Sequence, residues 1–152
     1  MFGNLNEEGV EYVLRHQLLG HIGCHANSKT YIVPICYAYD GKYIYCRTFE
    51  GMQIKMMREN PMVCFQVEHL ENMGKWESVI CWGKFEELTE INKRNKGIKV
   101  LQNRVLAVME DKTLQRSPNW PFSLIELDSV KGIIFCISVS EKTGRFENSL
   151  PN

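Results

Sequence analysis

The chain has 152 residues, which fits one domain and leaves little room for a second. Hydrophobic residues make up 44% of it and 18 basic residues balance 18 acidic ones, so binding to nucleic acid through a basic surface is not expected. No apolar run approaches the roughly 20 residues that span a bilayer, and the first residues lack a basic segment followed by an apolar core. We therefore expect a single domain over residues 1–152, in the cytoplasm, without a membrane or nucleic-acid partner.

The first third of the chain predicts a helix followed by a hairpin. Residues 6–18 carry apolar side chains at helical spacing. Runs rich in aromatic and β-branched residues follow, separated by turn signals, and these are typical of strands at residues 21–26, 31–39 and 43–48. The run at 31–39 is largely apolar on both faces, which is typical of a strand in a closed barrel.

The rest of the chain predicts two more helices among further strands. A short helix is expected over residues 51–59, with Asn60 and Pro61 as its stop. A long helix is expected from an N-cap at Thr89 to about residue 111. Its buried stripe is expected to comprise Ile91, Ile98, Leu101, Val105 and Met109. Further strands are expected at residues 62–68, 76–88, 123–127 and 132–139.

Two details refine this pattern. Gly83 lies inside an expected strand, which suggests a bend or bulge. Residues 117–121 read as a loop.

About six strands with two or three helices predict a mainly β fold, a β-barrel with flanking helices. Apolar faces left over in so short a chain favour burial against a second copy.

The six cysteines are widely spaced, and no two of them form a C-x-x-C pair. A zinc site usually takes two ligands from one tight turn, and disulfides are rare without secretion. We therefore expect reduced, mostly buried thiols and no metal site.

Several segments in the middle of the chain form an ordered series. They are Val33–Tyr37, Tyr43–Thr48, Glu50–Ile54, Asn60–Phe65, Trp76–Val79, Gly83 and Glu86–Leu88. This series resembles the FMN-binding split β-barrel family related to pyridoxamine 5'-phosphate oxidase, nearest to the nitroimidazole-resistance branch. Thr143–Arg145 matches that branch as well, and the resemblance covers roughly residues 8–147.

The resemblance implies a homodimer that holds two flavins in the groove between its subunits. Residues 33–37 would lie along the isoalloxazine ring, and residues 47–48 with the following helix start would hold the phosphate. The partner's segment at residues 76–79 would close the other side. FMN is expected over FAD. The implied cofactor-binding residues are Val33, Pro34, Ile35, Cys36, Tyr37, Arg47, Thr48, Gly51, Met52, Gln53, Lys55, Trp76, Ser78 and Val79.

Residue chemistry agrees with that placement. A phosphate monoester favours the N–H groups of a helix N-terminus, and Gly51 allows close approach there. Arg47 can make a bidentate, charge-assisted contact. Flat walls for the ring could come from Tyr37, Trp76 and Trp82.

One departure concerns charge. The family's phosphate-holding lysine falls at Gln53, and Arg47 stands where this branch frequently has histidine. We expect the positive charge to have moved to Arg47, with Lys55 or Arg58 helping.

Three functions remain open at this stage. The first is an FMN-dependent oxidoreductase acting on a small, aromatic or nitro-bearing substrate, for which the sequence identifies no catalytic residue. The second is a flavin carrier, store or sensor without turnover. The third is a haem-binding relative, which needs His21 or His25 facing the groove. Pyridoxamine 5'-phosphate oxidase activity itself is disfavoured, because no basic phosphate-binding segment is recognisable in residues 143–152.

Overall fold

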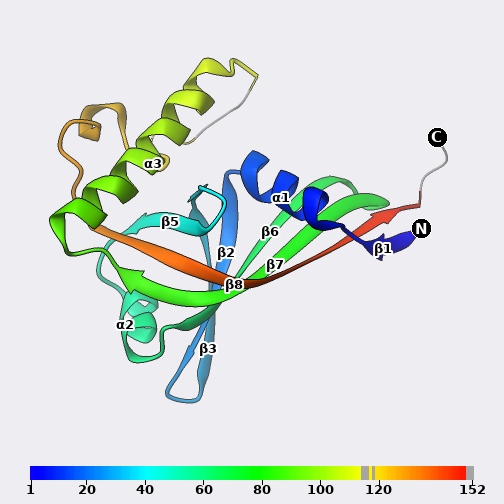
Figure 1. Cartoon of the computed structure of the whole chain (residues 1–152), viewed down its shortest axis with the longest axis horizontal. Helices are drawn as coiled ribbons and strands as arrows, with labels where there is room; N and C mark the ends of the chain where they lie inside the picture. Colours follow the sequence, from blue (N-terminus) through cyan, green and yellow to red (C-terminus); the bar gives the residue numbers. More distant parts are fainter. Residues whose placement is uncertain (114–116, 118, 150–152) are drawn as a thin grey trace.

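A computed structural model describes residues 1–113, 117 and 119–149 of the chain, so Pro118 of the expected 117–121 loop lies outside the described residues. Its strands form one antiparallel sheet in the order β3-β2-β6-β7-β8-β5-β4, with β1 beside β8 (Figure 1). The elements in chain order are β1 (Phe2–Asn4), α1 (Glu7–His16), β2 (Leu19–Ala26), β3 (Lys29–Cys36), β4 (Ala38–Tyr39), β5 (Tyr43–Thr48), α2 (Met52–Glu59), β6 (Met62–Asn72), β7 (Lys75–Glu87), α3 (Ile91–Glu110), a single 3₁₀ turn at Leu124–Glu126 and β8 (Ile133–Asn148).

The sheet bends into a split barrel because its two edge strands are neighbours in the chain. β3 is at one edge and β4 at the other, and only Tyr37 separates them in sequence. The chain itself therefore joins the two edges. β8 is the longest strand and pairs with β1, β5 and β7. The mainly β barrel with flanking helices is confirmed, although the expected strand at 31–39 is two strands.

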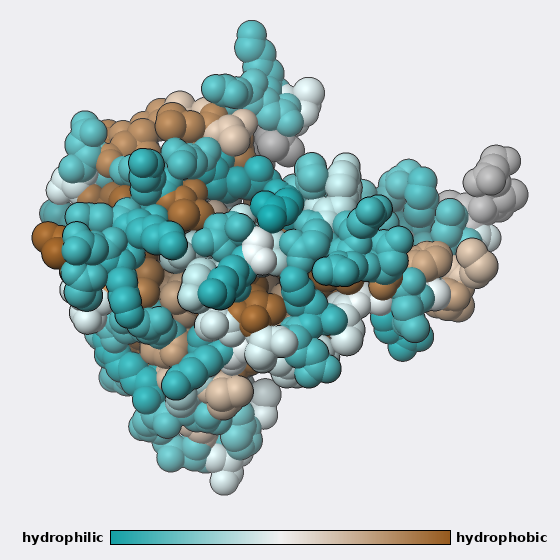
Figure 2. Space-filling view, viewed as in Figure 1, coloured by the Kyte–Doolittle hydropathy of each residue, from teal (hydrophilic) through white to brown (hydrophobic). Residues whose placement is uncertain are grey.

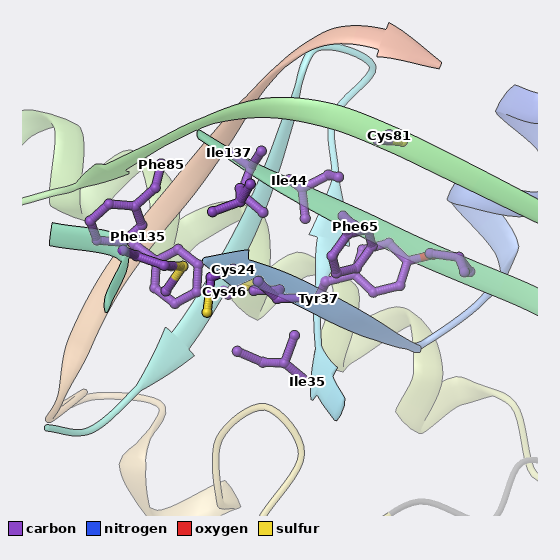
Figure 3. Packing of buried hydrophobic residues seen from close by; sticks show 14 of the residues in the cluster. Cys24, Ile35, Tyr37, Ile44, Cys46, Phe65, Cys81, Phe85, Phe135 and Ile137 are labelled. Carbon is purple, nitrogen blue, oxygen red and sulfur yellow. The ribbon is translucent and has the colours of Figure 1, made fainter. Parts of the chain in front are cut away.

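The core fills the barrel and continues beneath the helices. In Figure 3, Tyr37 lies beside Phe65 and Phe85 beside Phe135, with ring centroids 4.9 Å and 5.3 Å apart. A second cluster lies between α3 and the sheet, around Leu101, Val105 and Ile134. All six cysteines are free thiols, and Cys24, Cys46, Cys81 and Cys136 are buried, as expected of small hydrophobic side chains.

Gly83 sits at a β-bulge, as the sequence suggested. The pairing of β7 with β8 shifts register between Trp82 and Gly83. A Cβ atom at Gly83 would lie 2.4 Å from the carbonyl oxygen of Ser138, so the two strands come too close there for any side chain.

Helix α3 differs from expectation at both ends. Its N-cap is Glu90 rather than Thr89, and the Glu90 carboxylate accepts hydrogen bonds from the N–H groups of Asn92 and Lys93. Ile91 is 69% exposed and Met109 is also exposed, so neither belongs to the buried stripe. Gly97 and Val108 are buried in that stripe instead.

The strand expected at residues 123–127 is wrong, because Leu124–Glu126 forms a 3₁₀ turn. Ser123 and Glu126 make a reciprocal capping box there, which satisfies the turn's first N–H groups locally. Among the described residues, no helix is long and apolar enough to cross a membrane.

Candidate functional site

A pocket of about 600 Å³ opens where the ends of β3 and β5 meet the start of α2. This volume is typical of small-molecule sites, which span about 300–1,000 Å³. The segment between α3 and β8 forms its opposite wall. The lining residues are Leu19, Pro34, Ile35, Cys36, Arg47, Thr48, Phe49, Gln53, Ser117, Asn119, Trp120, Pro121 and Glu126.

Among the described residues, Arg47 is the only cation in this lining, and its side chain is 6% exposed. Nε donates to the carbonyl of Lys131 at 2.7 Å, and Nη1 donates to the carbonyl of Pro121 at 3.2 Å. The guanidinium also lies 4.9 Å from the ring centre of Phe49 and 5.3 Å from that of Phe122. Two carbonyls and two aromatic rings therefore fix its position.

Glu126 is the only anion that the described part of the chain contributes to the lining, and it pairs with Arg47 through both carboxylate oxygens. Nη2 donates to Oε1 at 2.7 Å and Nη1 to Oε2 at 3.1 Å, the bidentate geometry that a guanidinium favours. Hydrogen bonds from Arg47 lower the pKa of Glu126 to about 2, with help from the N–H of Ser123. The two charges of this pair therefore neutralise each other.

Gln53 brings an unpaired donor to the pocket. Its Nε2 atom is buried and has no hydrogen-bond partner among the described residues. Gln53 lies in the first turn of α2, whose N-cap Gly51 offers no side-chain acceptor to the free N–H groups of that turn. A Cβ atom at Gly51 would meet nothing within 4 Å, so the space before the helix is open. The Gln53 amide and the free N–H groups of α2 are donors at this end of the pocket, which suits an anionic or carbonyl-rich ligand.

Trp120 builds the wall opposite β3. Its ring is buried, and its indole Nε1 donates to the carbonyl of Leu18 at 3.2 Å. Cys36 faces the same space from the end of β3, and burial raises the pKa of its thiol to about 11. With Pro34, Ile35 and Leu19 these residues form flat, mostly apolar surfaces.

Six of the residues that the sequence assigned to the cofactor line this pocket together: Pro34, Ile35, Cys36, Arg47, Thr48 and Gln53. Gly51, Met52 and Lys55 are exposed around the first turn of α2. Val33 is half-buried on β3, next to Pro34. Arg58, suggested as a helper, is instead paired with Glu50 and Glu87.

Two further assigned residues have their side chains in the core. Tyr37 is 1% exposed, and its phenol donates to the carbonyl of Leu14, so its ring is no wall of the pocket. Val79 is fully buried inside the barrel, which leaves only its backbone for contact with a ligand.

Trp76 and Ser78 lie away from the pocket within one chain. Trp76 lines a separate groove of about 450 Å³ with Tyr12 and Phe146, and its indole donates to Glu147 at 2.8 Å. Ser78 accepts a hydrogen bond from Gln66 on the outer face of the sheet. Trp82 is 39% exposed on that face.

The histidines weighed as haem ligands do not line the pocket. His21 is half-buried on β2, opposite Pro34 of β3. His25 is exposed and shares a hydrogen bond with Thr30.

Sequence reasoning missed the whole wall contributed after α3. Ser117, Asn119, Trp120, Pro121 and Glu126 all line the pocket from that segment. Only one local signal was present, since the Ser-x-x-Glu spacing of Ser123 and Glu126 is that of a capping box.

The sequence matches the family described as pyridoxamine 5'-phosphate oxidase over residues 6–121, which include β2 to β7 and most of this pocket. The chain belongs to that family. An uncharacterised protein of Rhizobium meliloti is 31% identical over 134 residues, covering 84% of this chain and 83% of the relative.

Solved structures of similar proteins agree with the fold. A structure described as an FAD-binding protein of Mesorhizobium loti superposes with a TM-score of 0.73 at 25% identity, covering 96% of this chain and 98% of that one. A structure described as a 5-nitroimidazole antibiotic resistance protein of Bacteroides thetaiotaomicron superposes with a TM-score of 0.69 at 17% identity, covering 96% and 87%. The split barrel of this family member is therefore shared along nearly its whole length.

Proposed function

We propose that this member of the pyridoxamine 5'-phosphate oxidase family binds a flavin nucleotide in the pocket between β3, β5 and α2. The observation that carries the proposal is the convergence of the Arg47 guanidinium, an unpaired amide donor and an open helix N-terminus on one mostly apolar pocket. A flavin nucleotide combines a flat, carbonyl-bearing ring with a phosphate. The ring matches the apolar walls of the pocket, and the phosphate matches its hydrogen-bond donors.

In this proposal each wall has its own task. Pro34, Ile35 and Trp120 hold the ring between apolar surfaces. Gln53 donates to a carbonyl or phosphate oxygen, which removes the cost of its buried, unpaired Nε2. The N–H groups at the start of α2 attract the phosphate.

The nucleotide form is tested directly. The family resemblance favours FMN, whereas the Mesorhizobium loti protein is described as binding FAD, which weighs toward the dinucleotide. FMN and FAD share the isoalloxazine ring and its adjoining phosphate, so binding of the two nucleotides is compared side by side.

We further propose that the bound flavin serves an oxidoreductase reaction on a small, flat substrate of the nitroaromatic class. The flavin supplies the electron transfer, and the chain's own residues orient it and exclude water. The charged side chains among the described lining residues, Arg47 and Glu126, are paired with each other, and we propose that they position the ligand. Support for the nitroaromatic class comes from the likeness to the Bacteroides thetaiotaomicron protein.

The protein is also proposed to act as a homodimer. Ile32, Gly23, Cys64 and Trp82 lie in one row across four strands on the outer face of the sheet. Ile32 is 65% exposed, Met62 and Ile80 are exposed beside the row, and Gly23 keeps it flat. A second copy that covered this face would bury its apolar side chains, and the family resemblance implies that the partner's segment at residues 76–79 then closes the flavin site.

The test starts with the purified protein. We expect flavin absorbance, and mass analysis of the material released on denaturation identifies FMN or FAD. Calorimetric titration of the flavin-free protein with FMN, FAD and riboflavin then gives one site per subunit. The absence of binding of all three at micromolar protein would make the proposal wrong.

A further inference from the structure

The fork of Arg47 is an oxoanion site that the protein's own carboxylate occupies. Both Nη atoms donate to Glu126, at 2.7 Å and 3.1 Å, in the bidentate pattern that phosphate also accepts. The pair lines the pocket described above, so the carboxylate occupies the place where a ligand phosphate would meet the guanidinium of Arg47.

Arg47 does not depend on Glu126 for its position. Nε is held by the carbonyl of Lys131 and Nη1 by the carbonyl of Pro121, and the rings of Phe49 and Phe122 lie on the guanidinium. If the carboxylate left, these contacts would still hold the guanidinium, and N–H groups of both Nη atoms would be free for another oxoanion.

Glu126, in contrast, is weakly held apart from this pair. Its side chain is 30% exposed, and it ends a 3₁₀ turn in which Ile125 is 93% exposed. Its remaining side-chain partner is Ser123, within the same turn. A rotation of the Glu126 side chain into solvent breaks its hydrogen bonds to Arg47 and Ser123 and leaves the buried guanidinium without an anion, a loss that the phosphate of an incoming ligand would offset.

We propose that Glu126 is a displaceable internal anion. It occupies the Nη donors of Arg47 until the phosphate of the ligand replaces it. The proposal rests on the flavin site proposed above and adds its specificity-determining residue. Glu126 competes with phosphate-bearing ligands and does not compete with riboflavin, which has no phosphate. The residue therefore sets how strongly the pocket favours a nucleotide over the free vitamin.

The experiment compares Glu126→Gln with Glu86→Gln, a matched control that removes the same charge from an exposed pair with Lys93. Each flavin-free protein is titrated with FMN and with riboflavin. For Glu126→Gln we expect FMN to bind roughly tenfold more tightly, a change of about 1.4 kcal/mol, and riboflavin to bind as in the wild type. Unchanged FMN affinity, or equal changes for both ligands, would overturn the proposal.

A second measurement separates this proposal from the flavin proposal. The unfolding temperature of each protein is recorded with and without inorganic phosphate. We expect phosphate to raise it more for Glu126→Gln than for the wild type and Glu86→Gln, which share any general salt effect. If no flavin binds but this difference appears, the flavin proposal fails and the oxoanion site stands. Equal shifts in all three proteins would overturn the internal anion.

Discussion

The phenol of Tyr37 donates a hydrogen bond to the backbone carbonyl of Leu14 at 2.7 Å, inside the core. This bond joins the single residue between β3 and β4 to the end of α1, and burial raises the pKa of Tyr37 strongly. Tyr37 is thus a structural tie between the barrel closure and a covering helix.

We predict that Tyr37→Phe lowers the free energy of unfolding by about 1–3 kcal/mol, because the carbonyl of Leu14 loses its partner in a buried place. Flavin affinity should stay at the wild-type value. Urea denaturation and FMN titration measure the two effects, with Tyr12→Phe at an exposed site as the control. A loss of affinity without a loss of stability would return Tyr37 to the binding site.

Gln53→Met should separate stability from binding. The change removes a buried amide nitrogen that has no partner among the described residues, so the ligand-free protein should gain roughly 1 kcal/mol in stability. Flavin affinity should fall, because the donor to the ligand is lost. Denaturation of the flavin-free protein and calorimetric titration test both signs, and a loss of both properties would contradict the proposed role of the amide.

Arg47→Ala should weaken FMN by about one to two decades more than it weakens riboflavin, since only FMN loses a charge-assisted contact. The same change frees the carbonyls of Pro121 and Lys131, so the unfolding midpoint should also fall. Binding is therefore measured below that midpoint, with Arg145→Ala at an exposed position as the control. Equal losses for the two ligands would mean that Arg47 acts only on structure.

The ion pair of Arg47 and Glu126 predicts a particular acid sensitivity. The pKa of Glu126 is about 2 in the folded protein and about 4.5 without its partners. Its contribution to stability is therefore complete above about pH 4.5 and is lost as the pH falls toward 2. Unfolding of the wild type and of Glu126→Gln, followed between pH 6 and pH 3, should show a steeper acid decline in the wild type. Parallel declines would argue against the pair.

The proposed dimer face is tested by Trp82→Glu, which places a charge at the β7 end of the exposed apolar row. We expect sedimentation at micromolar concentration to change from dimer to monomer and flavin affinity to fall with it. Ile91→Glu on α3 is the matched control, because Ile91 is exposed far from that row. A wild-type monomer with full flavin occupancy would rule out the shared site.

Most of the fold was predictable from the sequence because its signals are local. Periodic apolar residues revealed α1 and α3, and Asn60 with Pro61 marked the end of α2. The apolar residues after Ser123 misled, because Leu124 and Ile125 read as a strand although both are exposed. The capping box of Ser123 and Glu126 was the stronger local signal, because it indicates the start of a helical turn. The two apolar residues between them favoured a strand only by their hydrophobicity.

The site was predictable only on the side that the family resemblance covers. The ends of β3 and β5 and the start of α2 carry six of the implied residues. The opposite wall depends on contacts such as that of Arg47 with Glu126, between residues far apart in the chain. No local pattern encodes such a contact, so Trp120 and Glu126 appear only once the chain is folded.

In the space-filling view, apolar surface gathers beside α3, whereas the end of the β6–β7 hairpin is largely hydrophilic (Figure 2).

The position of β8 in the sheet affects how the chain folds during its synthesis. This strand lies between β7 and β5, so until it leaves the ribosome both neighbours carry unpaired edges. Translation adds roughly 5–20 residues per second. Several seconds therefore pass between the synthesis of β5 and the synthesis of Ile133, the first residue of β8. During this interval the nascent chain exposes two strand edges that are paired in the folded protein. A chaperone that shields strand edges would bind the chain at this stage.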